Sequence, residues 1–404
     1  MAASTPTTLA SRLKEQYNGE ISNLVPGETV LVKLKFREEI SLGKSAEFDV
    51  QLSDELGFSV GQGDVSLNGS IAQTSARASV NAYTLVLQAQ ASYDLISRAS
   101  TDKKAFAKFS DSKFIPMTES FQRRQELLHM YGRDGIGQVT SNTAGVLLIT
   151  EASWCPTVWM ALKGAVINAY TAKTAGTIHN GDLTVAAVNV LTREVTVTGT
   201  NAAVVANDQL FLKGTYDQGH IGLMTIARNT GTLFGINAVG NPLWSANSYD
   251  VGTSAITLGK LLAAAALSAN KGCLEKLKVL VPVSAFQALV NDQAALRQYS
   301  ADYKEDQAKN GFKSISFFGA SGELEIVPYK YIKQGEFVMF PERWTSIIGS
   351  SKMVNTLNGD DMIFDMPNNT AKEMRLFSDV QLFIERPGYV TYGTRSDGKA
   401  LGAP

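Results

Sequence analysis

The segment from Glu28 to Leu95 constrains the fold of this 404-residue chain more than any other. It reads as long β-segments, with clear alternation in "EFDVQL" and "YTLVLQAQ", separated by the glycine- and serine-rich stretch "DELGFSVGQGDVSLNGSIAQT". Two long strands with a polar tip predict an extended hairpin. Such a hairpin has few residues to cover its faces and is marginal alone. The fold must therefore give the hairpin another surface to pack against.

The totals describe a large protein without a strong charge. The chain is 44% hydrophobic and 19% charged, which allows a sizeable core and two or three domains. A net charge of -1 creates no field that attracts nucleic acid or anionic membrane. Cys155 and Cys273 are the only cysteines, which excludes a disulfide framework and favours a reducing cytoplasm. Cys155 has no nearby histidine and is expected as a small buried hydrophobe.

No targeting or membrane segment is expected. The start, "MAASTPTTLASRLKEQYNGE", is too polar for a signal peptide. The most apolar helical run, Leu261–Ala269, is too short to span a bilayer. The sequence therefore predicts a soluble protein made in a cytosol.

Segments with helical periodicity lie before and after the predicted hairpin in the sequence. "TLASRLKEQYN" predicts an amphipathic arm with a thin apolar stripe, and "ETVLVKLKF" (Glu28–Phe36) is of β type. "MTESFQRRQELLHMYG" predicts a firm helix after Pro116, with Thr118 as its N-cap. Further on, "TLGKLLAAAALSANKG" and "SAFQALVNDQAALRQYS" predict helices on either side of the buried strand "LKVLVP". "MRLFSDVQLFIERPGYVTYGT" predicts two closing strands.

Two other segments have a distinct β character. From Trp154 to Gly214 the chain changes to short strands with Thr/Val alternation, which predicts a small β-barrel inserted into a host domain. Ser314–Ile348 predicts four strands split by tight turns, without histidine, cysteine or a serine beside a base. We interpret this second segment as a rigid platform for contacts between copies of the protein.

The histidines and one lysine-containing loop do not predict a reaction centre. His129, His179 and His220 lack a second ligand at metal spacing, and we assign them structural or surface roles. "SLGKS" (Ser41–Ser45) is similar to the end of a phosphate loop, but Glu38 stands where that loop needs glycine.

The remaining candidates have simpler explanations. Asp360, Asp361 and Asp365 could hold a cation, yet acidic turn residues account for them. Asn68 and Asn368 match the glycosylation pattern without a secretion signal. Basic residues are scattered, with no aromatic and basic stripe of the nucleic-acid kind. We therefore predict no catalytic residues, no cofactor and no metal.

The order of these segments resembles the major capsid protein of tailed bacteriophages, with its Hong Kong 97-like shell fold, over nearly the whole chain. The hairpin resembles the extended loop that reaches over a neighbouring subunit, and "MTESFQRRQELLHMYG" the spine helix. "ARNTGTLFGINAVGNPLW" (Ala227–Trp244) and the two helices after it are similar to the axial domain. Ser314–Ile348 resembles the peripheral-domain sheet beside the spine helix, and "RLFSDVQLFIERPGYVTYGT" the returning strands. The barrel resembles insertion domains of some phage shells.

The resemblance implies an α+β fold, the Hong Kong 97-like phage capsid fold with an inserted β-rich domain. Its expected parts are an N-terminal arm (1–27), an extended-loop hairpin (28–95), a peripheral domain with the spine helix (96–153), an inserted β-barrel-like domain (154–217), an axial domain (218–312), a peripheral-domain sheet (313–348) and the axial return with the C-terminus (349–404).

The implied function is structural. Copies of the chain would form hexamers and pentamers of an icosahedral head shell, made in the bacterial host's cytoplasm. The shell would enclose double-stranded DNA without sequence-specific binding, with no role at a membrane. Expected partners are the chain itself, a separate scaffolding protein, a portal and an optional decoration protein. Expected contacts between subunits are Arg37, Glu38, Glu39, Phe58, Arg123 and Arg124.

Alternatives stay open at this point. Arg37–Glu39 fit a solvated charged turn equally well. An encapsulin-type nanocompartment shares the fold, and a monomeric β-rich binding protein is a different class. Two further expectations are that the barrel faces outward, with Asn180 and Asn201 accessible, and that Lys44–Ala82 is ordered only in shells.

Overall fold

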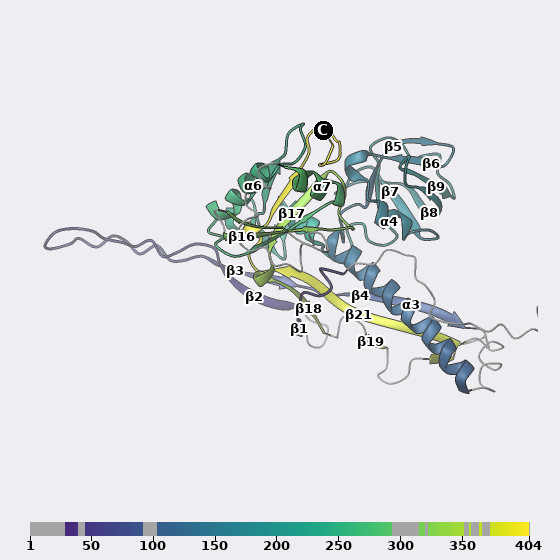
Figure 1. The fold of residues 1–404 in the computed structure, drawn as a ribbon. Coiled ribbons are helices and arrows are strands. Elements are labelled where there is room, and N and C mark those ends of the chain that lie inside the picture. Colours follow the sequence, from purple (N-terminus) through teal and green to yellow (C-terminus); the bar gives the residue numbers. More distant parts are fainter. Residues whose placement is uncertain are drawn as a thin grey trace, which may run out of the picture.

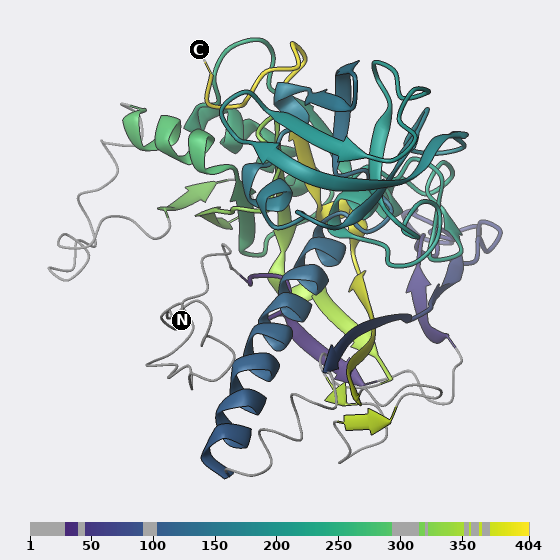
Figure 2. The ribbon, with the colours of Figure 1, turned by 90° about the vertical axis from the view of Figure 1, so that its right-hand side faces the viewer.

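The structure is a computed structural model that describes residues 29–38, 45–91, 103–292, 315–319, 322–350, 355–356, 363–365 and 372–403. Over these residues the chain forms two six-stranded sheets, a closed barrel and a long projecting hairpin (Figures 1 and 2). The expected arm at 1–27, Glu39, Asp360, Asp361 and Asn368 lie outside the described residues, as does the side chain of Asp365.

One sheet, here called the lower sheet from its place in Figure 1, is organised around the 13-residue strand β21. Helix α3 crosses one face of it (Figure 2). Met117 and Phe121 of α3 pack against Leu376 of β21, with Leu85 and Leu87 of β4 beside them. The alternation of β4 therefore places one set of side chains under α3. The strands of the lower sheet are β1 (Lys35–Glu38), β4 (Tyr83–Ala91), β18 (Thr345–Gly349), β19 (Asn355–Thr356), β20 (Ile363–Asp365) and β21 (Lys372–Ile384).

Helix α3 (Lys103–Met130) is longer than the sequence predicted. It runs through Pro116, whereas we expected a start after that residue with Thr118 as N-cap. A proline removes one backbone hydrogen bond and tends to end an isolated helix. Here the helix continues, because α3 packs along the lower sheet and this contact outweighs the local preference.

A buried glutamate in α3 holds the chain just before β1. Glu126 accepts hydrogen bonds from the backbone N–H groups of Val30 and Leu31, both at 2.9 Å, and of Val32 at 2.8 Å. The hydroxyl of Tyr329 donates to the same carboxylate at 2.6 Å. Burial raises the pKa of Glu126, while these hydrogen bonds act in the opposite direction and lower it. The expectation of β structure throughout Glu28–Phe36 was therefore wrong, since residues 30–34 turn around this carboxylate.

The second sheet, here called the upper sheet, carries helices α6 (Leu258–Asn270) and α7 (Val283–Asn291), whose apolar faces share a core with β14. The predicted buried strand "LKVLVP" is confirmed as β14, with β16 parallel on one side and β17 antiparallel on the other. The upper sheet has the order β13 (Asn247–Asp250), β22 (Thr391–Thr394), β17 (Glu336–Pro341), β14 (Leu277–Val281), β16 (Gly322–Pro328) and β15 (Ile315–Gly319).

The expected peripheral-domain sheet at 313–348 needs correction. Strands β15, β16 and β17 belong to the upper sheet, and only β18 joins the lower sheet beside α3. The idea that this segment is a platform between copies also fails for β17 and β18, because every residue of both strands is buried within one chain. Short local patterns predicted these strands, but their pairing depends on β14, which is distant in sequence.

The barrel is closed and begins earlier than expected. We placed its start at Trp154, but β5 and β6 supply two of its strands, so the barrel starts at Gly137. Closure leaves no free strand edge, and alternate apolar residues fill the interior. Its strands are, in spatial order, β10 (Gln209–Leu212), β5 (Gly137–Thr143), β6 (Val146–Ile149), β9 (Glu194–Thr198), β8 (Ile178–Asn189) and β7 (Val166–Tyr170).

The two chain segments that connect the barrel to the rest meet at one point, where Gly132 forms a β-bridge with Ile221. Gly132 has φ +51°, and a Cβ there would lie 2.2 Å from the carbonyl oxygen of His220. Only glycine fits this crossing.

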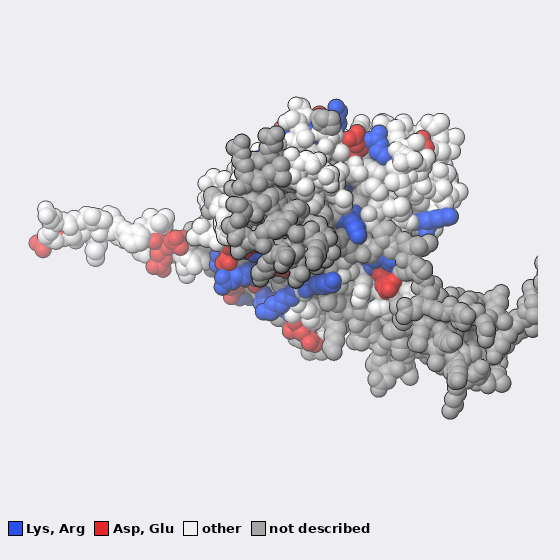
Figure 3. Space-filling view, viewed as in Figure 1, with Lys and Arg blue, Asp and Glu red and all other residues white. Residues whose placement is uncertain are grey.

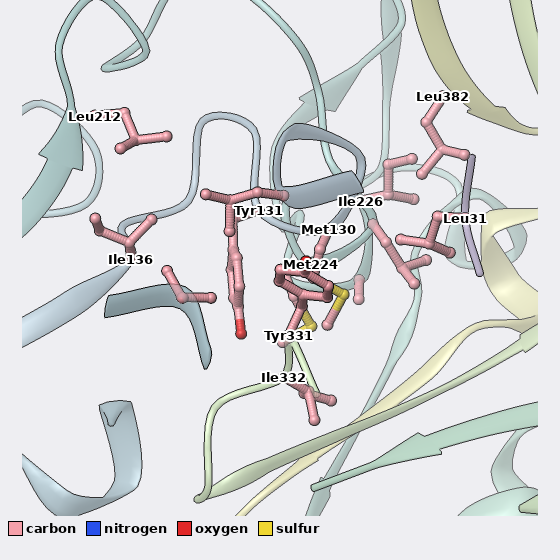
Figure 4. Close-up of a cluster of buried hydrophobic side chains, with 14 of the residues drawn as sticks. Leu31, Met130, Tyr131, Ile136, Leu212, Met224, Ile226, Tyr331, Ile332 and Leu382 are labelled. Carbon is pink, nitrogen blue, oxygen red and sulfur yellow. The ribbon is translucent and has the colours of Figure 1, made fainter. Parts of the chain in front are cut away.

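The barrel shares its hydrophobic core with the rest of the chain, and its separate folding stays a prediction. Trp154 and the fully buried Trp159 stack at 6.3 Å at its base, next to the short helix α4 (Pro156–Met160). Figure 4 shows Leu212 of β10 in the same cluster as Tyr131 at the end of α3. Helix α5 (Leu223–Ala227) contributes Met224 to this cluster.

A buried group of charges joins the barrel to the upper sheet. Arg228 forms ion pairs with Asp134 and with Glu336, the second at 2.5 Å. Lys173 of the barrel and Lys333 reach the same Asp134 at 3.0 and 3.7 Å. Burial alone would raise the pKa of Asp134, but these three cations hold it well below its usual value. Burial lowers the pKa of Lys333 to about 8.

The hairpin consists of β2 (Ala46–Gln51) and β3 (Ser75–Val80), followed by a longer tip. Its base is packed: Ala78 and Val80 are fully buried, and Phe48 stacks on Phe383 at 4.7 Å. The short hairpin β11 (Thr232–Leu233)–β12 (Ile236–Asn237) supports it through the carbonyl of Phe234, which accepts from the N–H of Ser79 at 2.8 Å. We predicted that all of Lys44–Ala82 becomes ordered only in shells. Since the base of the hairpin is packed within one chain, we now expect this only of the tip.

Candidate subunit interface

The hairpin tip, residues 52–74, projects away from the body of the molecule (Figure 1). Asp54, Glu55 and Asp64 give it three negative charges, and it contains no lysine or arginine. Figure 3 shows the projecting part in white and red without blue. Its large apolar side chains are exposed by 40 to 97%: Leu56, Phe58, Val60, Val65, Leu67 and Ile71.

The tip cannot cover these side chains by itself. Between the base and the end, Leu56 N–H donates to the Ile71 carbonyl at 3.1 Å, but no strand is formed beyond β2 and β3 within the described part of the hairpin. Burying one such side chain contributes roughly 1.5–3 kcal/mol. A concentration of exposed apolar residues on a projection is typical of an interaction surface.

A groove lies between α3, β4 and the barrel, with a volume of about 450 Å³, and we call it the helix–barrel groove. Its wall also carries Arg123 and Arg124 of α3 and Lys213, which follows β10. Apolar residues from all three elements line it, among them Leu85, Val86, Phe121, Leu128, Leu162 and Leu212.

The three cations of the groove differ in their surroundings. Arg123 lies 3.9 Å from Glu119 one helical turn away, and Lys213 pairs with Asp182 at 2.9 Å. Arg124 forms no ion pair with any described residue, and burial lowers its pKa. A half-buried cation that has no carboxylate partner in the described part of the chain suits an anionic group of another molecule.

The structure separates the predicted contact residues into three places. Arg37 lies at the hairpin base, where it pairs with Glu385 of the same chain and lies 5.2 Å over the ring of Phe48. Phe58 is 76% exposed on the tip. Arg123 and Arg124 share the groove, and Glu38 is exposed at the end of β1.

Of the apolar residues at the tip, the sequence analysis predicted only Phe58 as a contact. It predicted no contact residue on the barrel side of the groove. The spacing of Leu56, Phe58 and Val60 at every second position was a usable signal. Lys213 carried no such signal, since it reaches the groove only because β10 closes the barrel beside α3.

The other candidate groups hold structural positions. His129 and His220 are buried and adjacent, and His179 contacts Asp208 at 2.9 Å in the barrel. Burial raises the pKa of the Cys155 thiol to about 12. Among the described residues no group of three histidine, cysteine or acidic side chains could hold a metal, and no described helix is long and apolar enough to cross a membrane.

Comparison with known proteins identifies the fold. No protein-family model and no curated protein sequence matches the chain. A chain of the cyanophage A-1(L) capsid asymmetric unit superposes with a TM-score of 0.56 at 11% identity, covering 99% of this chain and 100% of that one. A chain of the capsid of a native GTA particle gives 0.50 at 9% identity, covering 98% and 99%. The protein therefore has the Hong Kong 97-like fold of phage capsid subunits, as the order of its segments predicted, with an inserted β-rich domain.

Proposed function

We propose that this chain is the major capsid protein of a tailed phage. Its copies assemble as hexamers and pentamers into an icosahedral head shell around packaged double-stranded DNA. The observation that carries the proposal is the apolar, acidic hairpin tip projecting from a chain whose fold matches capsid subunits from end to end. A free monomer would leave this surface in water.

The tip of a second copy is the proposed occupant of the helix–barrel groove. The tip carries three negative charges and no positive one, while Arg123, Arg124 and Lys213 lie on the groove wall. Phe58 and the apolar residues around it match the apolar lining between α3 and β4. Opposite charge sets the register of such a contact, and apolar burial supplies most of its free energy.

The rest of the proposal follows from the shell. The role is structural, and the near-neutral chain encloses DNA without holding it, because strong phosphate contacts would bind it in place. A separate scaffolding protein, a portal and an optional decoration protein are the proposed partners. The chain is made in the bacterial host's cytoplasm and becomes part of the virion.

Electron microscopy of the expressed chain tests the proposal. With a phage scaffolding protein present, we expect closed icosahedral particles built from rings of six and five subunits. Small particles of one size, at every concentration and with scaffold added, would contradict it. Closed shells that contain a co-purifying cargo enzyme instead of DNA would favour a nanocompartment.

Labelling of assembled particles tests whether the barrel faces outward. Both native cysteines are fully buried, so a maleimide reports only an introduced one. We expect Leu191→Cys, at a 95% exposed position between β8 and β9, to react completely in intact shells. Asn180 is only 7% exposed, so our expectation that it is accessible was wrong. Asn180→Cys therefore serves as the control that should not react. Protection of Leu191→Cys in shells but not in free subunits would place the barrel at a contact or inside.

A further inference from the structure

Two histidines that are 91 positions apart form one buried hydrogen-bonded chain. His129 Nδ1 lies 2.7 Å from His220 Nε2, and His220 Nδ1 lies 3.2 Å from the carbonyl oxygen of Val380. A carbonyl only accepts, so His220 carries its proton on Nδ1. Its Nε2 is then an acceptor, which the N–H of Leu382 also approaches at 3.4 Å. His129 must therefore donate from Nδ1, an arrangement that two neutral rings satisfy.

The pair lies where three segments cross. His129 is in the last turn of α3, Val380 is in β21, and His220 follows the barrel directly before the bridge between Gly132 and Ile221. The two rings are 4.5 Å apart between centroids and both residues are buried. The hydrogen-bonded chain thus fixes the end of the helix to the middle of the lower sheet, through the segment that returns from the barrel.

The arrangement has no place for another proton. His129 Nε2 is buried and has no hydrogen-bond partner among the described residues. A proton there would create a charge without an acceptor, and a proton on His220 Nε2 would set two donors against each other. We propose that the His129–His220 pair is a latch that holds α3 on β21 while neutral and releases this joint on acidification.

The groups around the pair do not offset the charge. Burial and the His220 ring lower the pKa of His129, and burial lowers that of His220 to about 4, opposed only by the Val380 carbonyl. Glu126, one turn earlier in α3, is engaged by the backbone N–H groups before β1. Arg133 points to the Gly219 carbonyl and would repel an imidazolium. From β21, Gln381 presents a neutral amide to Ile221.

The direction of the pH dependence follows from these pKa values. Both folded-state values lie below the usual 6.5, so the unfolded chain binds more protons between pH 6.5 and about 4. The stabilisation is complete above pH 6.5 and is lost as the pH falls through this window. Carboxylates such as Asp134, whose folded pKa is lowered from 3.8, lose their contribution only at lower pH.

Urea unfolding of the full unassembled chain tests the latch. Between pH 6.5 and about 5, the unfolding equilibrium constant of the wild type should rise on the order of a hundredfold more than that of the double variant His129→Asn/His220→Asn, because each of the two histidines contributes roughly tenfold. Asparagine is neutral throughout this range and cannot take up the proton. Equal pH dependence in the wild type and the double variant would overturn the proposal.

The wild-type chain gives a second test if the double variant does not fold. The chain has only three histidines, so ¹⁵N labelling at histidine resolves each ring. We expect two rings to be neutral and protonated at Nδ1 at pH 6.5, and their charging to coincide with loss of protected amides at the end of α3. An Nε2-protonated or charged ring at His129 or His220 at that pH would refute the latch. The test concerns a single subunit, so its failure leaves shell assembly unaffected.

Discussion

A chain whose residues 53–73 are replaced by the turn Asn-Gly is expected to fold and to form no shells. Asn-Gly suits a two-residue hairpin turn, and the base of the hairpin keeps its packing through Phe48, Ala78 and Val80. The deleted residues are nearly all exposed in the subunit, so little packing is lost, and the shorter loop should stabilise the fold by up to about 2 kcal/mol. Sedimentation and electron microscopy would show capsomer-sized or smaller species only.

Single substitutions separate the contact from the length of the hairpin. Phe58→Ser should reduce shell yield strongly, while Leu191→Ser, at an even more exposed position on the barrel, should not. In the groove, Arg124→Glu should have the effect of Phe58→Ser, and Lys399→Glu, at an exposed position outside the groove lining, serves as its control. Normal shells from the chain without the tip, or equal yields from Phe58→Ser and Leu191→Ser, would rule out tip docking.

Arg228→Met is expected to cost about 3–5 kcal/mol of unfolding free energy. It leaves Asp134 and Glu336, whose side chains are 6 and 9% exposed, without their main counter-charge in a buried site. The cost is largest near neutral pH, where both carboxylates are ionised. Urea unfolding followed by the fluorescence of buried tryptophans measures it.

A matched variant tests whether the loss of unfolding free energy is due to the burial of the charges. Lys173→Met removes another cation from Asp134, but this lysine is 35% exposed, so we expect about 1 kcal/mol or less. If Arg228→Met unfolds at the same urea concentration as Lys173→Met, the buried charges do not hold the barrel to the upper sheet.

The sequence predicted those elements that have a local signature. Strand β14 is a short apolar run between turns, and α6 ends near Gly272 as its pattern indicated. Strands β21 and β22 were also expected. Strand β5, "GQVTSNT", was missed as part of the barrel, because its outward residues are polar and its apolar ones few. Which sheet β15–β17 join is decided by distant partners, so no local pattern could assign it.

The candidate interface was predicted in the same partial way. Phe58 could be predicted because it lies in an unusual glycine-rich segment, and Arg123 and Arg124 because they lie in an amphipathic helix. The groove itself arises only when β4 and the barrel lie on the same side of α3. The pairing of His129 with His220 likewise depends on the crossing at Gly132, which places two distant segments in contact.

The ladder between β4 and β21 has a mechanical consequence. Strand β3 continues into β4 after Asn81 and Ala82, and β4 pairs antiparallel with β21 over all nine of its residues. Antiparallel hydrogen bonds run perpendicular to the strands. A pull on the hairpin along its length therefore loads these pairs in shear, all at once, instead of opening them one by one. A shell strained from within would transmit tension between subunits through this ladder, and the rate of forced rupture would measure its strength.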